Sequence, residues 1–453
     1  MRSPPTFRVL LVNLPHPVRV QRRWVASYYA PNFLIPPLEL MGLVPLLRGR
    51  GFHVRLCDAI AEDLDGPALA RRYRDFGPDL VVALTGFGIV DDDLAELGAL
   101  RRELACEAAV FGYLPTRDPE RFARHPSVDW VLRGEPEETL VELCDALAGD
   151  APPTAPGLAF ERDGEVALTD ARPRIQDLDA LPFADHRAVR IERYSESFMP
   201  GPIGVIMSAR GCPYDCSFCV RTYGRSFVAR SWESLAEELT SLHALNLRHV
   251  RFLDDTLTVD RERVARLSEW LAAHLPDLTW TCLTRLDRLD PELCRVMAKG
   301  GCRRVYVGIE SSDPERLLAF GKGVTVEAIE AGVAAARGAG IEVSGFFIVG
   351  APGETEAEVK RSADFAARLG LDYVIVTRLQ RWPGTREEVD DALDLEDVDA
   401  FALERTFYRR FYLRPAWLRR KLPTLLSSPA DVGRGARALL RYVAGRVHDR
   451  DFI

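Results

Sequence analysis

The sequence lacks the features of a membrane, secreted or nucleic-acid-binding protein. None of its 453 residues fall in a run that reaches the roughly 18 consecutive apolar residues a membrane span needs. Residues 1–5 lead directly into a strand-like segment, without the apolar core of a signal peptide. A net charge of -8 provides no basic footprint for a phosphate backbone. We therefore expect a cytoplasmic protein with no membrane and no nucleic-acid partner.

Cysteine is too scarce, at nine residues in the whole chain, for a disulfide-stabilised scaffold. Internal repeats and low-complexity tracts are also missing. Three of the nine cysteines fall within one short segment, residues 212–219, and this cluster is the main chemical signal in the composition. The other six are scattered in mostly apolar surroundings: Cys57, Cys106, Cys144, Cys282, Cys294 and Cys302.

The first third of the chain alternates short apolar runs with helical patterns. Such alternation is typical of a parallel sheet that is covered on both faces, so residues 1–150 are predicted to form a doubly wound, Rossmann-like α/β domain. Proline-rich residues 151–200 are predicted to form a linker with a short hairpin around Asp163–Gly164. Strands are expected at residues 7–13, 53–57, 80–84, 108–111 and 130–132, and a helix at 38–50.

Residues 201–394 repeat the alternation with longer helices and are predicted to form a partial (β/α)6 barrel. Chemistry in parallel barrels lies on the loops beyond the carboxyl ends of the strands. Residues 395–453 are predicted to form a helical C-terminal cap with a last helix near 431–448, and the alternative is a lid that faces the substrate. Barrel strands are expected at 203–208, 249–253, 279–283, 304–309, 343–349 and 373–378.

The cysteines follow the first predicted barrel strand with spacings of three and two residues. Cys212, Cys216 and Cys219 on one loop can hold three corners of a cubic iron–sulfur cluster and leave the fourth iron open. An open position on a redox metal is a place where a small molecule can bind and react. Structural zinc, the alternative, usually takes four ligands, and the nearest downstream histidine is His243.

The segment 212–219, CPYDCSFC, is similar to the signature of the radical S-adenosylmethionine (SAM) superfamily, C-x3-C-x2-C with an aromatic residue before the last cysteine. This resemblance implies a [4Fe–4S] cluster whose open iron chelates SAM through its amino and carboxylate groups. An electron from a low-potential donor of flavodoxin or ferredoxin type then cleaves SAM to methionine and a 5′-deoxyadenosyl radical. The radical abstracts hydrogen from the substrate, and Phe218 is expected to pack against adenine.

Further segments resemble those of the superfamily, and they occur in the same order along the chain and at the ends of the expected strands. Asp254 and Asp255 follow the second barrel strand, Glu310 and Ser311 follow the fourth, and Gly350 follows the fifth. The resemblance implies that Asp254, Glu310, Ser311 and Gly350 bind SAM, and that Asp254, Asp255 and Glu310 take part in catalysis. Glycine in such a loop lets the backbone approach a ligand closely.

Each of these polar residues also has a purely structural interpretation. Asp254 and Asp255 can serve as a helix N-cap or a solvated turn, and Glu310 can form an ion pair within the barrel. Arg285 can pair with one of these carboxylates rather than contact the substrate. Residues 383–385, PGT, resemble the turn after the sixth strand of the family.

A doubly wound domain ahead of such a barrel resembles the cobalamin-binding members of the superfamily. Residues 36–40, 57–59 and 133–140 agree with that layout. Where those members usually carry Gly-Gly-x-His-x-Thr along the nucleotide tail of cobalamin, residues 111–116 read FGYLPT. Phe111 replaces a glycine and Leu114 replaces the histidine, and a bulky ring is a steric obstacle where backbone must approach a ligand. The domain therefore either binds cobalamin or keeps the fold without the ligand.

The presence of cobalamin would set the reaction. Without it, we expect dehydration or oxidation of a small polar substrate such as an aminosugar, because the layout also resembles the aminoglycoside radical dehydratases and dehydrogenases. In that case a carboxylate or tyrosine would assist the loss of water. With methylcobalamin, the alternative is C-methylation that consumes two SAM molecules. A further alternative is modification of a peptide or RNA, but an RNA enzyme would need a basic accessory domain. Another is an iron–sulfur or zinc sensor, but a sensor would not use the SAM-binding segments.

Overall fold

A computed structural model describes residues 7–25, 27–29, 33–380, 382, 384–385 and 399–427. The chain divides into two compact units, one that runs to Gly204 and one that begins at Val205. Pro383 and the helix expected at 431–448 lie outside the described residues. No helix in the described part of the chain combines the length and the apolar character that crossing a bilayer requires.

The first unit is built on a seven-stranded sheet of order β4-β1-β5-β6-β7-β8-β9. The strands from β4 to β7 pair in parallel, and β8 and β9 add an antiparallel hairpin to the β7 edge. The strands are β1 (Arg8–Asn13), β4 (His53–Asp58), β5 (Leu80–Leu84), β6 (Glu107–Phe111), β7 (Trp130–Leu132), β8 (Leu158–Arg162) and β9 (Glu165–Leu168).

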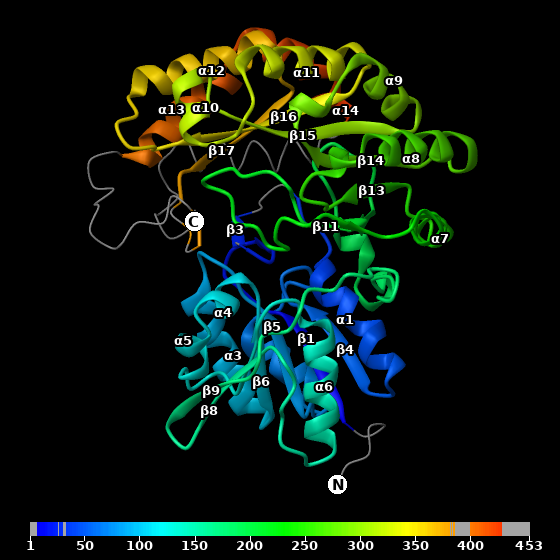
Figure 1. The fold of residues 1–453 in the computed structure, drawn as a ribbon, viewed down its shortest axis with the longest axis vertical. Helices are drawn as coiled ribbons and strands as arrows, with labels where there is room; N and C mark the ends of the chain where they lie inside the picture. The colour runs from blue at the N-terminus through cyan, green and yellow to red at the C-terminus, as the bar shows by residue number, and fades with distance from the viewer. Residues whose placement is uncertain are drawn as a thin grey trace. The chain divides into compact units, whose positions relative to one another are not determined.

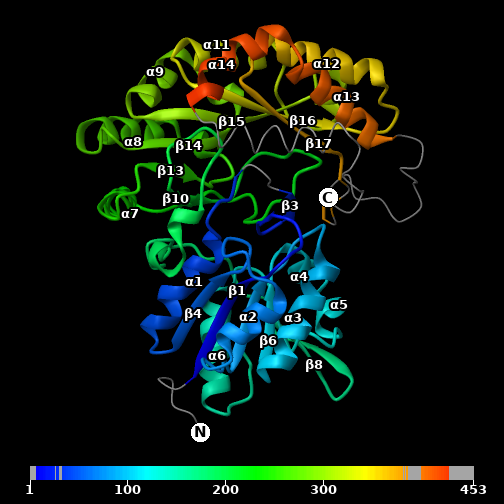
Figure 2. The ribbon, with the colours of Figure 1, turned by 180° about the vertical axis from the view of Figure 1, so that it is seen from behind.

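Helices cover both faces of this sheet, as expected for continuous apolar strands such as β5, whose residues are all buried. Helices α1 and α6 lie on one face and α2 and α3 on the other (Figures 1 and 2). The predicted doubly wound domain is therefore confirmed. The helices are α1 (Leu38–Gly49), α2 (Gly66–Tyr73), α3 (Val90–Leu104), α4 (Tyr113–Arg117), α5 (Pro119–Ala123) and α6 (Pro136–Ala148).

Two features of the first unit refine the sequence interpretation. The hairpin expected around Asp163–Gly164 is present as β8 and β9, and it extends the sheet of the first unit. A second hairpin, β2 (Val20–Arg22) and β3 (Ser27–Tyr29), was not anticipated. Its backbone is hydrogen-bonded to the loops after β5 and β6, because Phe87 donates to Val25 and Tyr113 donates to Trp24.

The second unit holds six strands in the order β10-β13-β14-β15-β16-β17, and the pairs from β13 to β17 are parallel. This sequential order is that of the expected partial (β/α)6 barrel, in which helices cover the outer face and loops at the strands' carboxyl ends are available for chemistry. The strands are β10 (Ile203–Ile206), β13 (His249–Phe252), β14 (Thr279–Thr284), β15 (Cys302–Glu310), β16 (Glu342–Val349) and β17 (Tyr373–Arg378).

The outer layer of the second unit is a row of helices in which α9, α11 and α12 lie side by side (Figure 1). Each of these helices begins at a side-chain cap. The capping residues, which accept a hydrogen bond from a backbone amide of the first turn, are Ser231, Asp260, Asp290, Asp313, Thr325 and Thr355. The helices are α7 (Trp232–Ala244), α8 (Arg261–His274), α9 (Pro291–Lys299), α10 (Pro314–Ala319), α11 (Val326–Gly338) and α12 (Glu356–Leu369).

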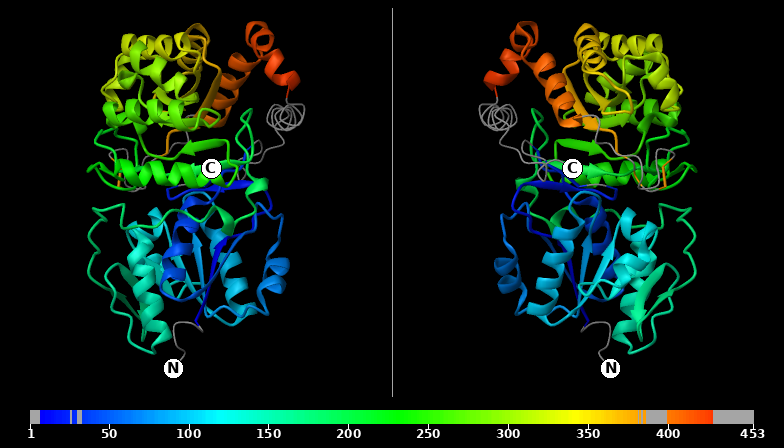
Figure 3. Two further views of the ribbon diagram at one scale, coloured as in Figure 1. Left: turned by 90° about the vertical axis from the view of Figure 1, so that its right-hand side faces the viewer. Right: turned by 90° about the vertical axis from the view of Figure 1, so that its left-hand side faces the viewer.

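The edge strand β17 is covered by the C-terminal helices α13 (Ala400–Tyr412) and α14 (Pro415–Ser427), which Figure 3 shows in orange and red. The amides of Val374 and Val376 donate to the hydroxyl groups of Tyr412 and Tyr408, at 3.0 and 2.9 Å. Side chains of α13 thus satisfy backbone groups that a further strand would otherwise pair with. The barrel stops at six strands in this way, and the predicted helical cap is present as far as the described residues extend.

Candidate active site

The three clustered cysteines lie on a loop, residues 211–227, that contains neither helix nor strand. The loop is closed at its base by the antiparallel pair β11 (Ala209–Arg210) and β12 (Val228–Ala229). The Cys212 amide donates to the Gly224 carbonyl at 3.1 Å. Gly211 has a φ of +91°, and a Cβ there would lie 2.1 Å from the Ser226 carbonyl oxygen, so this turn requires glycine. The sequence therefore presents three thiols on one closed loop after β10.

The thiols of this loop are the donor groups that an iron–sulfur cluster would bind. Cys212, Cys216 and Cys219 are free, and the described residues contain no group of three Cys, His, Asp or Glu side chains that could hold one ion. A cubic cluster binds each thiolate at a separate corner, so its ligands need not converge on one point. Thr256, on the loop after β13, places its Oγ1 3.7 Å from the Sγ of Cys212. The donor set fits a [4Fe–4S] cluster with one iron left without a protein ligand.

Two cations lie near the middle cysteine. Burial raises the pKa of the Cys216 thiol, whereas the charges of Lys322 and Arg285 lower it. The Arg285 guanidinium stacks on the ring of Tyr214, with Cζ 3.8 Å from the ring centroid, and donates to both carboxylate oxygens of Asp287 at 2.9 Å. It also donates to the Lys322 carbonyl at 2.9 Å. Arg285 thus ties the cysteine loop to the segment after β15, and its carboxylate partner is Asp287.

An apolar surface lies beside the third cysteine. Phe218 packs edge-on against Phe320, with ring centroids 5.3 Å apart, and it rests on a buried cluster of Phe320, Ile348, Ala351 and Leu379. These side chains come from four segments: the cysteine loop, the end of α10, β16 with its following loop, and the end of β17. Aromatic and aliphatic surfaces of this kind suit a flat heteroaromatic base. The position of Phe218 therefore fits the adenine contact that the resemblance implies.

The carboxyl end of β15 carries a buried ion pair. Glu310 Oε1 lies 2.6 Å from Lys322 Nζ, and the two side chains are 6% and 7% exposed. Glu310 has a φ of +67°, in the left-handed region. The next residue, Ser311, is buried and its Oγ accepts a hydrogen bond from the Asp313 amide at 3.1 Å, which stabilises the turn before α10. Of the predicted SAM ligands, Glu310 is thus paired with lysine, and Ser311 has a structural contact of its own.

Asp254 and Asp255 occupy different environments. Asp254 is buried, and its two carboxylate oxygens accept hydrogen bonds from the Ser208 amide and hydroxyl, each at 2.6 Å. Burial raises the pKa of Asp254 to about 6, and the hydrogen bonds from Ser208 oppose this shift. Asp255 is exposed, and its charge acts on the thiol of Cys219. Asp254 therefore joins the ends of β10 and β13. The negative charge of Asp255 raises the pKa of the Cys219 thiol in the cysteine loop.

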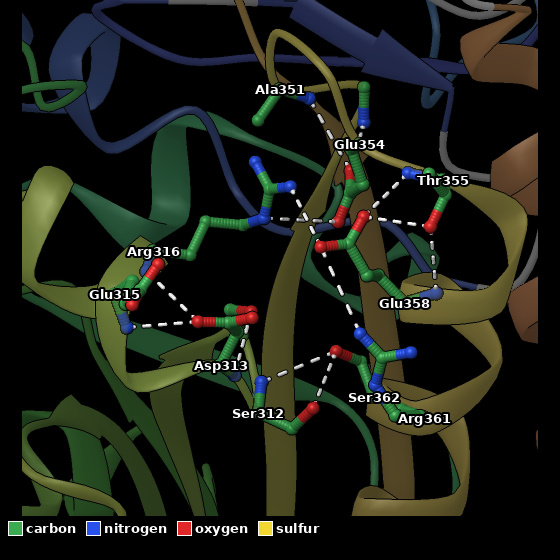
Figure 4. A network of polar contacts seen from close by, with 12 residues as sticks. Ser312, Asp313, Glu315, Arg316, Ala351, Glu354, Thr355, Glu358, Arg361 and Ser362 are labelled. Atoms are coloured by element: carbon green, nitrogen blue, oxygen red, sulfur yellow. Dashed lines mark hydrogen bonds and ion pairs between the residues drawn. The ribbon is translucent and has the colours of Figure 1, made fainter.

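The loop after β16 is fixed by a network of polar contacts (Figure 4). Gly350, at a φ of +80°, donates its amide to Glu354 Oε2 at 2.6 Å, and the Ala351 amide donates to the same oxygen at 3.3 Å. Arg316 lies 3.8 Å from Glu354 and 3.4 Å from Glu358. The network holds Ala351 in the apolar surface beneath Phe218. Glu354 orients the backbone of Gly350, and the contact with SAM expected for Gly350 stays a prediction.

The switch point of the first unit decides whether this domain fits the nucleotide tail of cobalamin. Ligands of doubly wound sheets bind where the strand order reverses, here between β1 and β5. At that point Arg22, from the β2–β3 hairpin and 1% exposed, donates to Asp93 at 2.8 Å and to Asn13 at 2.9 Å. Asn13 in turn donates to Asp58 at 2.8 Å, and Tyr194 donates to the same carboxylate. The chain's own side chains therefore fill the switch point.

The residues after β6 complete this arrangement. Phe111 is fully buried, and the ring of Trp24 lies against it with centroids 5.7 Å apart. A Cβ at Gly112 would lie 2.1 Å from the Thr85 carbonyl, so this glycine serves close packing of β5 on β6. Leu114, at the position where the cobalamin-binding members have histidine, belongs to the core. These residues do not fit a nucleotide tail at this edge of the sheet.

Sequence reasoning missed three residues of the site: Lys322, Thr256 and Glu354. Thr256 and Glu354 lie next to or within motifs that were recognised, but nothing in the motifs distinguishes their side chains. For Lys322 a compositional signal exists. The chain has 59 basic residues, and only Lys299, Lys322, Lys360 and Lys421 are lysines. The rarity of lysine in this arginine-rich chain is the signal that could have singled out Lys322.

Comparison with known proteins agrees with this geometry. The sequence profile of the Radical SAM superfamily matches residues 206–366, which span the cysteine loop and most of the barrel. An uncharacterized methyltransferase of Pyrococcus horikoshii is 33% identical over 358 residues, covering 78% of this chain and 77% of the relative. The anaerobic magnesium-protoporphyrin IX monomethyl ester cyclase of Cereibacter sphaeroides is 26% identical, covering 84% of this chain and 68% of the relative.

Among solved structures, the methyltransferase TsrM of Kitasatospora setae, with cobalamin and a [4Fe–4S] cluster bound, has the same fold. Its TM-score is 0.67 at 21% identity, with coverage of 84% of this chain and 76% of TsrM. The chain thus shares its fold with a radical SAM methyltransferase whose structure contains cobalamin. Together with the cysteine loop and the relative at 33% identity, these findings establish that the chain belongs to the radical SAM superfamily.

Proposed function

We propose that the chain is a radical SAM methyltransferase that adds a methyl group to a carbon atom of a small molecule. The observation that carries this proposal is the relative with 33% identity over most of both chains, which bears a methyltransferase name. The fold shared with TsrM, also a methyltransferase, supports it. This reaction was the alternative at the sequence level, where dehydration or oxidation was expected first.

The second unit provides the residues for the radical step. Cys212, Cys216 and Cys219 would hold the cluster, and SAM bound to its open iron supplies a 5′-deoxyadenosyl radical when one electron is delivered. Phe218 would hold adenine against its apolar neighbours, and Glu310 would accept hydrogen bonds from the ribose. The polypeptide thus orients SAM and excludes water, and the electron donor is proposed to be a small low-potential flavodoxin- or ferredoxin-type protein.

A product assay tests the proposal. Anaerobically reconstituted protein would be incubated with SAM, dithionite and a panel of aminosugars and other small polar substrates, with and without hydroxocobalamin. Methyl transfer predicts S-adenosylhomocysteine together with 5′-deoxyadenosine, and a product in which a methyl group replaces one hydrogen atom. Formation of 5′-deoxyadenosine alone, with a product lacking water or hydrogen, would contradict methyl transfer.

Radical dehydration or oxidation without cobalamin is the second candidate, because one observation favours it. The switch point of the first unit is filled by Arg22 and Asp93, and Trp24 covers Phe111, so the place for a nucleotide tail is taken. The corrinoid content of the purified protein, read from its visible spectrum, separates the two candidates independently of substrate. Stoichiometric cobalamin would exclude the second candidate.

A further inference from the structure

We propose that Lys322 is a positioning residue for SAM, which acts by holding the carboxylate of Glu310 at the wall of the SAM site. This inference deepens the proposed use of Glu310 toward SAM. It does not depend on whether the later chemistry is methyl transfer, dehydration or oxidation. Its test can therefore succeed or fail separately from that of the proposed reaction.

The backbone at Glu310 is the first reason. Its φ of +67° places a non-glycine, buried residue in the left-handed region. The pairing of β15 with β16 shifts register between Gly308 and Glu310, so the strand bulges at this point. Bulges commonly re-aim a side chain next to a site, and a costly conformation persists where the surroundings impose it. The bulge therefore directs the Glu310 side chain to a specific place.

The ion pair itself is the second reason. Glu310 and Lys322 are almost fully buried, with Oε1 and Nζ 2.6 Å apart. Burying two charges carries a desolvation penalty that their attraction often does not repay, so such a pair is poor evidence of a stabilising role. In the described structure the contact between Glu310 and Lys322 uses Oε1 of the carboxylate. Oε2 can then accept a hydrogen bond from a hydroxyl group of SAM while Lys322 holds the carboxylate in place.

The space around the pair explains why the cation is lysine. A Cβ added at Gly308 would lie 2.2 Å from Glu310 Oε1 and 2.2 Å from Lys322 Nζ, so the pair occupies the room that glycine leaves. A planar guanidinium is larger than an ammonium group and would not enter this space. Lysine is otherwise rare here, with four residues among 59 basic ones. The space that Gly308 leaves on β15 thus suits the small ammonium group of lysine.

The pair also lies close to the other parts of the site. Lys322 Nζ is 5.9 Å from the ring centroid of Phe218, and the positive charge of Lys322 acts on the thiol of Cys216. The Lys322 carbonyl accepts a hydrogen bond from Arg285, which stacks on Tyr214 of the cysteine loop. The ion pair is therefore adjacent to Phe218 and to the cysteine loop, the residues that would hold adenine and the cluster.

The test compares Lys322→Met, Glu310→Gln and the double variant in reconstituted, reduced protein. SAM binding is followed by titrating the change that SAM causes in the electron paramagnetic resonance spectrum of the cluster. Each single variant is expected to weaken SAM binding about tenfold, as the loss of one charge-assisted contact does. Because the two residues act as one unit, the double variant is expected to bind SAM no more weakly than the worse single variant.

Two matched controls accompany these variants. Lys421 is the other buried lysine with carboxylate partners, Glu342 at 2.6 Å and Asp372 at 2.8 Å, and Lys421→Met should leave SAM binding unchanged. Gly308→Ala displaces the ion pair without removing a charge, so it should weaken SAM binding. Gly338→Ala, where an added Cβ meets nothing within 4 Å, should not. Gly308→Ala also serves as the test if Lys322→Met fails to fold.

Three outcomes would overturn the inference. The first is wild-type SAM affinity in Lys322→Met or in Gly308→Ala. The second is a double variant whose loss equals the product of the two single losses, because independent residues would not act through each other. The third is loss of the cluster from Lys322→Met at wild-type folding, which would make Lys322 a residue for cluster retention. Weakened SAM binding with full iron content, in both Lys322→Met and Gly308→Ala, supports it.

Discussion

Buried carboxylates gather around the first strands of the second unit. Glu238 on α7 is 3% exposed, and its only cationic neighbour in the described structure is Arg230, at 3.8 Å. Burial raises the pKa of Glu238 to about 7, and the charge of Arg230 only partly opposes the shift. Asp254 lies close enough to raise this pKa further. Two acids with raised pKa values therefore make this region sensitive to pH.

Replacing Glu238 with glutamine is expected to flatten the pH dependence of stability. The folded state keeps its proton up to about pH 7, whereas the unfolded chain loses it near pH 4.5, so wild-type stability falls as the pH rises through this window. The loss is at most about 3 kcal/mol, since each unit of pKa difference corresponds to about 1.4 kcal/mol. Urea unfolding of Glu238→Gln between pH 4.5 and 7.5 measures it. An unchanged slope would show that Glu238 does not bind a proton in this range.

Cys216→Ala is expected to abolish the cluster and SAM cleavage. A cubane held by two thiolates loses a corner, so iron content, the brown absorbance and 5′-deoxyadenosine formation should all fall to background. Cys282→Ala is the matched control, because Cys282 is buried on β14, outside the loop. Retention of colour and of SAM cleavage in Cys216→Ala would contradict the assignment of the ligands.

At the scale of single residues, the sequence predicts functional residues well where they lie close together along the chain. Cys212, Cys216, Cys219 and Phe218 share eight consecutive positions, so their spacing alone indicates a cluster loop. The partner of Asp254 is Ser208, 46 residues earlier, and the partner of Glu310 is Lys322, 12 residues later across a helix. Such pairs depend on the tertiary arrangement, which motifs do not encode. The SAM contacts expected for Asp254, Glu310, Ser311 and Gly350 stay predictions, as do the catalytic roles expected for Asp254, Asp255 and Glu310.

Among the elements, the loop after β16 depends on a single side chain. Glu354→Ala would leave the amides of Gly350 and Ala351 without their buried acceptor, at a cost of about 1–3 kcal/mol in the free energy of unfolding. Because Ala351 belongs to the apolar surface beneath Phe218, the KM for SAM should rise more than kcat falls. Thermal unfolding and steady-state kinetics measure the two effects. Glu358→Ala, on the more exposed side of the same network, should change KM little.

The elements themselves were largely predictable because apolar strands alternate with amphipathic helices along the chain. All six barrel strands lie within a few residues of their expected bounds, and β1 and β5 match closely. The β2–β3 hairpin was not predicted. It is short, and its Arg22 is paired with Asp93, 71 residues away, so no periodic pattern marks it. Its position over the carboxyl ends of β1 and β5 became visible only in three dimensions.

At the scale of the whole molecule, SAM and cobalamin are expected to slow amide hydrogen exchange in different units. SAM should slow amide hydrogen exchange in the second unit, in the cysteine loop 211–227, in the turn after β16 and around Glu310. Hydroxocobalamin, if it binds, should slow exchange in the first unit, in the loops after β1, β5 and β6. Exchange mass spectrometry with each ligand separately measures both patterns. Protection by SAM that spares the cysteine loop would contradict the site described here.

The order in which the protein matures follows from the way the cysteine loop is attached. The barrel strands pair with one another through their backbones, and the loop is closed by β11, β12 and the bond from Cys212 to Gly224, none of which involves iron. We therefore expect the polypeptide to fold before the cluster is inserted. Protein produced in air should accumulate as a colourless, correctly folded precursor. Iron and sulfide supplied later under nitrogen should then convert this precursor to the cluster-containing protein without renaturation.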